Sequence, residues 1–197
     1  MKNLITLLFL SLTFSLSALA QNTVSVETND GLAYQQGDKI FLAGISFGYY
    51  GYGLGGTRAV AIPPLTAALE LGIHEYFSVG PYAGYASWDY GRLGSDFGFQ
   101  IFSVGARGSF HYIPLANEAL DLDLDEEKLD FYVTLLVGLE FQSYTGDFGA
   151  FNYASGTDFV FGPVLGFKYK FNEKFGVYFE GGRGAFGYGT LGLAVHL

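Results

Sequence analysis

The stretch that decides the fold is Leu129–Tyr144, LDFYVTLLVGLEFQSY, in which apolar residues recur at every second position. Side chains of a β-strand point alternately to its two faces. One face is wholly apolar and holds Phe131, Val133, Leu135, Val137, Leu139 and Phe141. The other face is mixed and holds Tyr132, Thr134, Leu136, Gly138, Glu140 and Gln142. About eleven tilted strand residues cover roughly 25 Å, the height of the apolar band on a membrane barrel.

The same alternation recurs along the chain and predicts eight strands. We expect them at residues 39–49, 65–74, 77–88, 102–110, 129–144, 159–171, 175–184 and 191–197. Half of the residues are hydrophobic, yet no apolar run long enough for a membrane helix follows residue 21. A closed barrel hides such a composition, because every backbone group is paired between strands. The expected fold is therefore all-β, an eight-stranded antiparallel up-and-down transmembrane β-barrel behind a cleaved N-terminal signal peptide.

The connections predict how this barrel is oriented. An even number of strands returns both ends of the barrel to the periplasmic side, where turns are short. We expect such turns at residues 74–76 and 172–174, and extracellular loops at 50–61, 89–97, 145–157 and 185–189. The connection 112–128 is too long for a turn, and it predicts either a short helix or an extension of the flanking strands. Two prolines, Pro81 and Pro163, fall inside predicted strands, where we expect local bulges and leave the register open.

The N-terminus has the three parts of a secretory signal peptide. Lys2 supplies a positive charge, residues 4–16 are apolar, and Ala18-Leu19-Ala20 is a small-x-small cleavage site. We expect cleavage between Ala20 and Gln21. The expected organisation is a signal peptide over residues 1–20, a periplasmic segment over 21–37 and the barrel over 38–197.

The charge and the residue usage exclude several classes of function. The formal net charge is −9, whereas phosphate binding needs clustered Lys and Arg, so we expect no nucleic-acid partner. The chain has no cysteine, which excludes disulfides and thiolate metal sites. It holds 29 glycines, and 18% of its residues are aromatic, which argues against disorder.

The sequence resembles a known family, the small eight-stranded outer-membrane barrels related to the OmpA transmembrane domain and OmpX, and most closely the short barrel proteins of Bacteroidota. The stretches that carry the resemblance are ELGIHEYFSVGPYAGYASW (70–88), GARGSFHY (105–112), DFYVTLLVGLEF (130–141) and GTLGLAVHL (189–197). The resemblance covers residues 38–197 and implies the barrel fold and the outer membrane of a Gram-negative bacterium. It implies no defined activity. Such proteins often end in Phe, whereas this chain ends in Leu197.

The inward face of the predicted barrel carries charged residues. They are Glu70, Arg107, Glu140, Lys168, Lys170 and Glu180, with Arg183 close by. An isolated buried charge is very costly, and an eight-stranded barrel is only wide enough to be filled by side chains. We therefore predict a paired charge network that plugs the lumen, and we keep a gated ion path and a catalytic group as alternatives.

The predicted extracellular loops are rich in aromatic residues. The candidates furthest from the membrane are Tyr52, Tyr90, Phe148, Phe151 and Tyr153, and Trp88 lies near them. Interfacial Tyr and Trp anchor barrels in membranes, whereas loops also carry binding sites. Both interpretations, a membrane girdle and a surface partner, stay open.

Motifs for cofactors, metals and catalysis fail on inspection. Gly51, Gly53 and Gly56 match a dinucleotide fingerprint, but no helix follows them. The acidic run 121–125 lacks the glycine and glutamate of a calcium loop. His74, His111 and His196 show no metal spacing and map to the periplasmic rim, away from the outer leaflet. We expect no cofactor, no metal and no enzymatic activity.

These observations predict an integral outer-membrane protein with a structural or surface-interaction role. The first alternative is a small porin-like pore for ions or solutes, and the second is a secreted, lipocalin-like ligand-binding barrel. The expected partners are outer-membrane lipid, the barrel-assembly and periplasmic chaperone machinery, and an unknown surface partner. We expect the protein to be a monomer.

Overall fold

The computed structural model describes residues 32–47, 59–92, 95–146, 155–182 and 188–197. They belong to one compact unit, residues 31–197, and the barrel lies within it. The predicted signal-peptide site at Ala20 and Gln21 lies outside the described residues.

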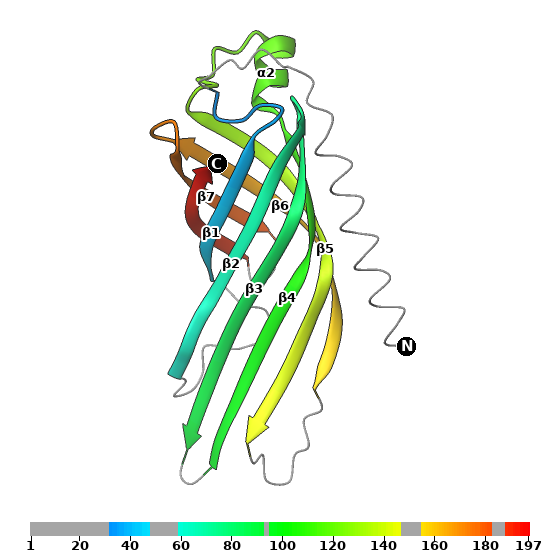
Figure 1. The fold of residues 1–197 in the computed structure, drawn as a ribbon, viewed down its shortest axis with the longest axis vertical. Coiled ribbons are helices and arrows are strands. Elements are labelled where there is room, and N and C mark those ends of the chain that lie inside the picture. Colours follow the sequence, from blue (N-terminus) through cyan, green and yellow to red (C-terminus); the bar gives the residue numbers. More distant parts are fainter. Residues whose placement is uncertain (1–31, 48–58, 93–94, 147–154, 183–187) are drawn as a thin grey trace. The chain divides into compact units, whose positions relative to one another are not determined.

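Eight antiparallel strands, each paired with its neighbours in the chain, close into a barrel when β8 pairs with β1 (Figure 1). This confirms the predicted all-β, eight-stranded antiparallel barrel. The strands are β1 (Lys39–Phe47), β2 (Ala59–His74), β3 (Phe77–Arg92), β4 (Ser95–His111), β5 (Leu129–Gly146), β6 (Gly156–Lys170), β7 (Phe175–Gly182) and β8 (Gly189–His196).

The two ends of the barrel differ. One end, here called the turn end, holds the short β2–β3 and β6–β7 turns, as predicted. It also holds the connection from β4 to β5, which contains the helix α2 (Ile113–Leu120) and so confirms the first of the two alternatives for that connection (Figure 1). Pro114 lies in the first turn of α2, where a missing N–H costs no helical bond. The opposite end is called the loop end.

None of the helices among the described residues is both long and apolar enough to span a membrane.

The predicted loop 89–97 is wrong. β3 and β4 stay paired within these residues, from Asp89↔Gly98 to Arg92↔Ser95. β2 likewise begins at Ala59, inside the predicted loop 50–61. Aromatic residues on adjacent strands explain the extension of β3 and β4, because cross-strand aromatic pairs stabilise a ladder. Trp88 is paired with Phe99 in this way, and their rings lie 5.7 Å apart.

The predicted bulges at Pro81 and Pro163 are also wrong. Pro81 pairs with Ala106 of β4, and Pro163 with Leu135 of β5, and neither ladder shifts its register there. Pro163 lies just past Val164↔Gly182, the last described β6–β7 pair, where a missing N–H costs no ladder bond.

The register shifts lie instead in the β2–β3 ladder. They fall between Val60 and Leu65 and between Gly72 and His74. The first interval contains the consecutive prolines Pro63 and Pro64. Two neighbouring residues without N–H donors cannot keep a regular ladder, so the bulge forms there.

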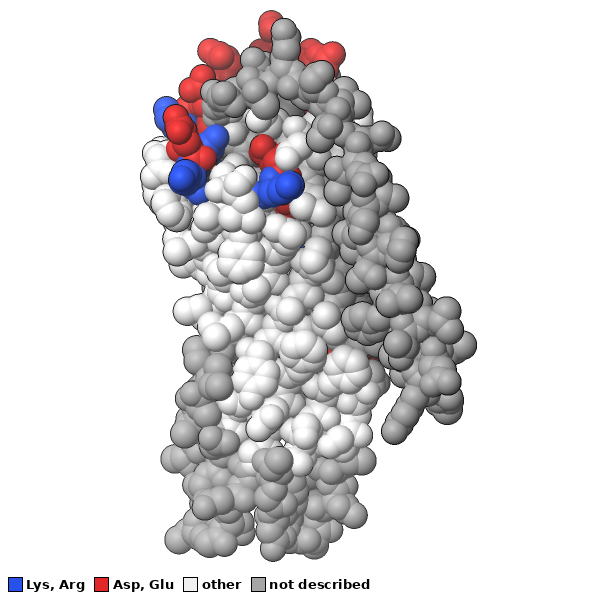
Figure 2. Space-filling model, viewed as in Figure 1, with Lys and Arg blue, Asp and Glu red and all other residues white. Residues whose placement is uncertain are grey.

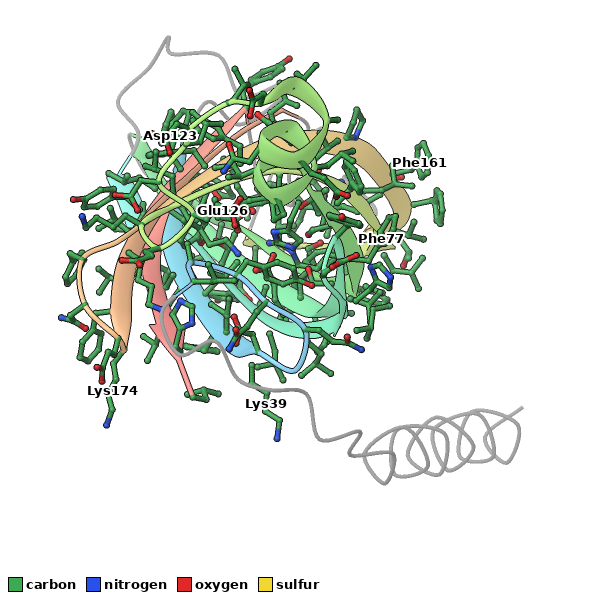
Figure 3. All side chains as sticks on the ribbon, turned by 90° about the horizontal axis from the view of Figure 1, so that it is seen from above. Lys39, Phe77, Asp123, Glu126, Phe161 and Lys174 are labelled. Carbon is green, nitrogen blue, oxygen red and sulfur yellow. The ribbon has the colours of Figure 1, made fainter. Side chains whose placement is uncertain are left out.

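Alternation decides what faces inward. In β5 the predicted apolar face points outward and is exposed, whereas Tyr132, Thr134, Leu136 and Glu140 are buried in the lumen. Seen along the barrel, side chains fill its interior, while the labelled Phe161, Lys39 and Lys174 point away from it (Figure 3). The alternation therefore assigns the faces as predicted.

Lumen tyrosines pack over five inward-facing glycines, which explains why these positions have no side chain. A Cβ on Gly166 would overlap the ring of Tyr132, and a Cβ on Gly105 or Gly138 would press on Tyr82. Tyr178 covers Gly44 and Gly192 in the same way. A narrow barrel has room for large rings only where the opposing strand residue has no side chain.

Candidate functional site

Four charged residues of the lumen lie on four different strands. Glu70 lies on β2, Arg107 on β4, Lys168 on β6 and Glu180 on β7. All four side chains point inward because of the two-residue period, and the closed sheet brings them together at the turn-end half of the lumen. Each of these residues is buried.

Arg107 is the centre of this cluster. Its Nη2 atom lies 2.6 Å from Glu180 Oε1 and 3.1 Å from Glu70 Oε1. The same nitrogen donates a hydrogen bond to Thr134 at 3.2 Å, and Tyr132 donates to Glu180 at 2.9 Å. Charge-assisted hydrogen bonds of this length are stronger than those between neutral groups. Arg107 thus joins β4 to three other strands, β2, β5 and β7, across the lumen.

Lys168 extends the cluster toward the turn end. Its Nζ atom lies 2.5 Å from Glu70 Oε2 and 3.0 Å from Asp130 Oδ2. The ammonium group also lies 4.7 Å from the centre of the Tyr132 ring, within reach of a cation–π contact. Arg107, Lys168, Glu70, Glu180 and Asp130 are here called the lumen charge cluster.

His111 closes the turn-end side of this cluster. Its Nδ1 atom lies 2.9 Å from the carboxylate of Asp130, and its Nε2 atom lies 3.0 Å from the hydroxyl of Ser78. Ser78, His111 and Asp130 thus follow the order of nucleophile, base and orienting group. All three are buried, and the ring of Tyr34 stacks on the imidazole at 3.5 Å. Because no substrate can reach the hydroxyl in this arrangement, the three residues form a structural hydrogen-bond chain.

Tyr34 belongs to residues 32–38, here called the N-terminal strap, which precede β1 and lie at the turn end. Its hydroxyl donates to the carbonyls of His74 and Phe77 on either side of the β2–β3 turn. Burial first, and then the charges of Glu70 and Asp130, raise the pKa of Tyr34 above its usual range. The hydroxyl therefore stays protonated and remains a donor.

Two more groups at the turn end have shifted pKa values. Burial raises the pKa of Asp38, whose carboxylate accepts a hydrogen bond from the backbone N–H of Gln35. A hydrogen bond to Glu118 of α2 raises the pKa of Tyr76 to about 12. This second bond ties the β2–β3 turn to α2.

The other predicted lumen residues lie away from the lumen charge cluster or outside the described residues. Glu140 is buried in the lumen nearer the loop end, where it accepts a hydrogen bond from Gln142 at 3.0 Å. Lys170 lies at the rim, and its Nζ donates to the carbonyl of Leu32 in the strap. Arg183 lies outside the described residues.

The predicted loop aromatics fare differently from one another. Tyr52, Phe148, Phe151 and Tyr153 lie outside the described residues. The backbone of Tyr90 is part of β3 and pairs with Phe97, so the prediction that it lies in a loop is wrong. Trp88 is only 7% exposed and packs inside the barrel with Ala86, Phe99 and Ile101, so it is no exposed membrane anchor.

One member of the lumen charge cluster, Asp130, and two of the cluster's hydrogen-bond partners, Thr134 and Ser109, were absent from the sequence-based candidates. Asp130, Thr134 and Ser109 share the inward faces of their strands with residues that were named. Extending the alternation of β5 by one step would have found Asp130. The contact between Tyr34 and His111 had no such cue, because the strap lies outside every strand.

Among the described residues, no group of three or more His, Cys, Asp or Glu side chains could hold a metal ion.

A cavity of about 20 Å³ lies on one side of Arg107 and is lined by Thr66, Tyr82, Leu136 and Tyr178, among others. A space of this size holds about one water molecule. Beside Arg107, therefore, the lumen has room for about one water molecule.

Comparison with known proteins finds relatives in structure alone. No family model matches the chain, and no curated protein matches its sequence. The crystal structure of Ail, the attachment invasion locus protein of Yersinia pestis, in complex with the heparin analogue sucrose octasulfate, is 13% identical, covers 82% of this chain and 99% of its own, and has a TM-score of 0.48. The outer membrane protein OprG from Pseudomonas aeruginosa is 14% identical over 83% of this chain and 90% of its own, with a TM-score of 0.43.

The N-terminal β-barrel domain of Pseudomonas aeruginosa OprF is a third such structure, 14% identical over 83% of this chain and 98% of its own, with a TM-score of 0.36. The attribution to Bacteroidota stays a prediction. In fold, the chain is similar to these small eight-stranded outer-membrane β-barrels.

Proposed function

We propose that this protein is an integral outer-membrane β-barrel with a structural or surface-interaction role and a lumen closed by the lumen charge cluster. One observation supports this above all: the polarity of the barrel is reversed relative to a soluble one. Its outward face is mainly apolar, and the lumen charge cluster is buried inside.

The outward face is too apolar for water. Phe159, Phe161 and Leu165 on β6 are 63%, 51% and 66% exposed. Over the middle of the visible face the described residues are almost all uncharged, and most of the described Lys, Arg, Asp and Glu side chains in view lie at the turn end (Figure 2). Soluble monomers rarely expose apolar patches larger than a few hundred Å². Lipid is the solvent that suits this face.

The orientation follows from the two ends. Short turns belong on the periplasmic side of outer-membrane barrels, so we assign the turn end, with α2 and the strap, to the periplasm. The loop end then faces the cell surface. The loop aromatics Tyr52, Phe148, Phe151 and Tyr153 would meet any surface partner there.

A secreted, lipocalin-like barrel would need the opposite polarity, an apolar lumen and a polar exterior.

A pore would need an open lumen. Arg107 is held between Glu70 and Glu180 across the barrel, and the cavity beside it has room for about one water molecule. A closed lumen therefore ranks above the porin-like alternative.

The proposal includes no enzymatic activity. Among the described residues, Ser78, His111 and Asp130 follow the order of nucleophile, base and acid, but all three are buried and the ring of Tyr34 stacks on His111. Outer-membrane lipid and the barrel-assembly and periplasmic chaperone machinery are the proposed partners, and we propose a monomer.

Refolding into detergent micelles and phospholipid vesicles tests the proposal. A membrane barrel migrates differently on a denaturing gel before and after boiling. Leu135→Lys places a charge on the lipid-facing side of β5 and should cost about 2–4 kcal/mol in vesicles if it lies near the midplane. A chain that stays soluble without detergent and tolerates Leu135→Lys would overturn membrane insertion.

Conductance in planar bilayers separates the closed lumen from the pore. The proposal predicts no stepped currents from the intact barrel. Regular single-channel steps would replace the closed lumen with the porin-like alternative.

A further inference from the structure

We propose that the N-terminal strap, residues 32–38, gates the periplasmic mouth of the lumen, with Tyr34 as the stopper. The inference rests on the proposed function, because it concerns access to the closed lumen. It adds a second barrier to the lumen charge cluster, one that can move without opening the sheet.

The seat of Tyr34 is made by several elements. The residue is only 4% exposed, and its ring lies nearly parallel to the His111 imidazole, at an angle of 6° and a centroid distance of 3.5 Å. Its hydroxyl reaches the carbonyl of His74 at 2.8 Å and that of Phe77 at 2.5 Å. The Lys168 ammonium lies 5.8 Å from the ring centre. Tyr34 therefore covers the turn-end members of the polar lumen with one flat apolar ring.

Both ends of the strap are tied to the rim. Ala33 N–H donates to the carbonyl of Glu126 at 2.7 Å, and Lys170 donates to that of Leu32 at 2.7 Å. At the other end, backbone hydrogen bonds join the strap to β2. The N–H of Gly37 donates to the carbonyl of Gly72 at 2.8 Å, and the N–H of Gly72 donates to the carbonyl of Asp38 at 2.9 Å. The strap thus crosses from the segment after α2 to β2.

The strap can leave without unravelling the barrel. It precedes β1, which begins at Lys39 and is paired on both sides by β2 and β8. Closure of the sheet does not depend on any strap residue. The strap is held at separate points, whereas β1 is paired along its length on both sides, so we expect the strap to open at a lower free energy than the strands. Opening would expose Ser78, His111, Asp130 and Lys168 to water from the periplasm.

The absence of cysteine allows a direct test. Ser78→Cys places a single thiol beneath Tyr34, next to His111. The probe is a small cationic methanethiosulfonate, and the readout is its rate of reaction with the folded barrel in detergent micelles. The cysteine thiolate attacks the sulfenyl sulfur of the thiosulfonate, which forms a mixed disulfide and releases methanesulfinate.

We expect slow labelling when Tyr34 is present. Tyr34→Ala should raise the rate by about tenfold or more, since tenfold corresponds to about 1.4 kcal/mol of lost closure. Tyr34→Phe keeps the ring over His111 and should stay protected relative to Tyr34→Ala. Ser46→Cys, whose hydroxyl position is buried beside Thr190, is the control for the rest of the lumen, and its rate should not respond to Tyr34→Ala.

Two results would overturn the gate. One is rapid labelling of Ser78→Cys with Tyr34 in place. The other is slow labelling of Ser78→Cys that persists after Tyr34→Ala, in a barrel that still shows the folded gel mobility. In that case the lumen charge cluster alone closes the mouth, and the proposed function stands without the gate. If Tyr34→Ala does not fold, Lys170→Met removes the bond to Leu32 and must raise the rate instead. Failure of the closed lumen itself is read separately, as conductance of the unmodified chain.

Discussion

Removing Arg107 tests the lumen charge cluster most directly. Arg107→Met keeps much of the side-chain volume and removes the charge that faces Glu70 and Glu180. Glu70 retains Lys168 at 2.5 Å and Ser109 at 3.3 Å. Glu180 retains the Tyr132 hydroxyl at 2.9 Å as its one other hydrogen-bond partner among the described residues. The loss therefore falls mainly on Glu180.

The magnitude follows from that imbalance. Breaking a buried ion pair by removing one partner costs about 3–5 kcal/mol, because a charge stays buried without compensation. Adding Glu180→Gln to Arg107→Met removes this orphaned charge. We expect the double variant to be more stable than Arg107→Met by about 1–3 kcal/mol, the penalty of an unsatisfied buried group.

The assay is urea unfolding in detergent micelles, followed by the fluorescence of Trp88, the single tryptophan of the chain. The matched control is Lys128→Met. Lys128 pairs with Asp125 at 3.2 Å, but the two side chains are 53% and 44% exposed. An exposed pair contributes about 0–1 kcal/mol. Equal free energies of unfolding for Arg107→Met and Lys128→Met would refute the paired lumen, as would a double variant less stable than Arg107→Met.

Three further predictions concern single sites. Gly166→Ala should cost about 1–3 kcal/mol, because its methyl group overlaps the Tyr132 ring. A methyl group on Gly108 would meet only the Ser78 carbonyl, at 4.0 Å, so Gly108→Ala should leave the unfolding free energy nearly unchanged; equal costs would contradict the packing account. Burial raises the pKa of Asp38, so this carboxyl stabilises the fold when protonated, and its contribution is lost as the pH rises from the ordinary aspartate value of about 3.9 through the raised pKa. Asp38→Asn should abolish that pH dependence of the unfolding free energy in urea titrations. An unchanged pH profile would rule out Asp38 as its source. Asn117 donates to the carbonyl and accepts from the N–H of Leu124, so Asn117→Ala should loosen the segment after α2 and speed its limited proteolysis; an unchanged cleavage rate would count against this role.

Strand identity could be predicted because it depends on a local pattern. The alternation in Leu129–Tyr144 reports which face each side chain takes, and the same period recurs in the other strands. Burial of Glu70, Arg107, Lys168 and Glu180 follows from that period once the apolar face is assigned to lipid. The ends of the strands were predicted less accurately, as the length of the β3–β4 hairpin shows. Aromatic pairs such as Trp88 and Phe99 extend a ladder into residues whose composition is typical of a loop.

By itself, then, the sequence determined the barrel fold, the number of strands, the short helix as one of two options, and the inward direction of Glu70, Arg107, Lys168 and Glu180. Only the tertiary structure decided which charges meet. Arg107 and Glu180 are 73 positions apart, and Lys168 and Glu70 are 98 apart, so their contacts depend on closure of the sheet and on its register. The bulges near Pro63 and Pro64, the seating of Tyr34 on His111 and the inward turn of Trp88 are of the same kind. A two-residue period fixes the face of a side chain, whereas its partner is set by strands that the chain brings together from far away.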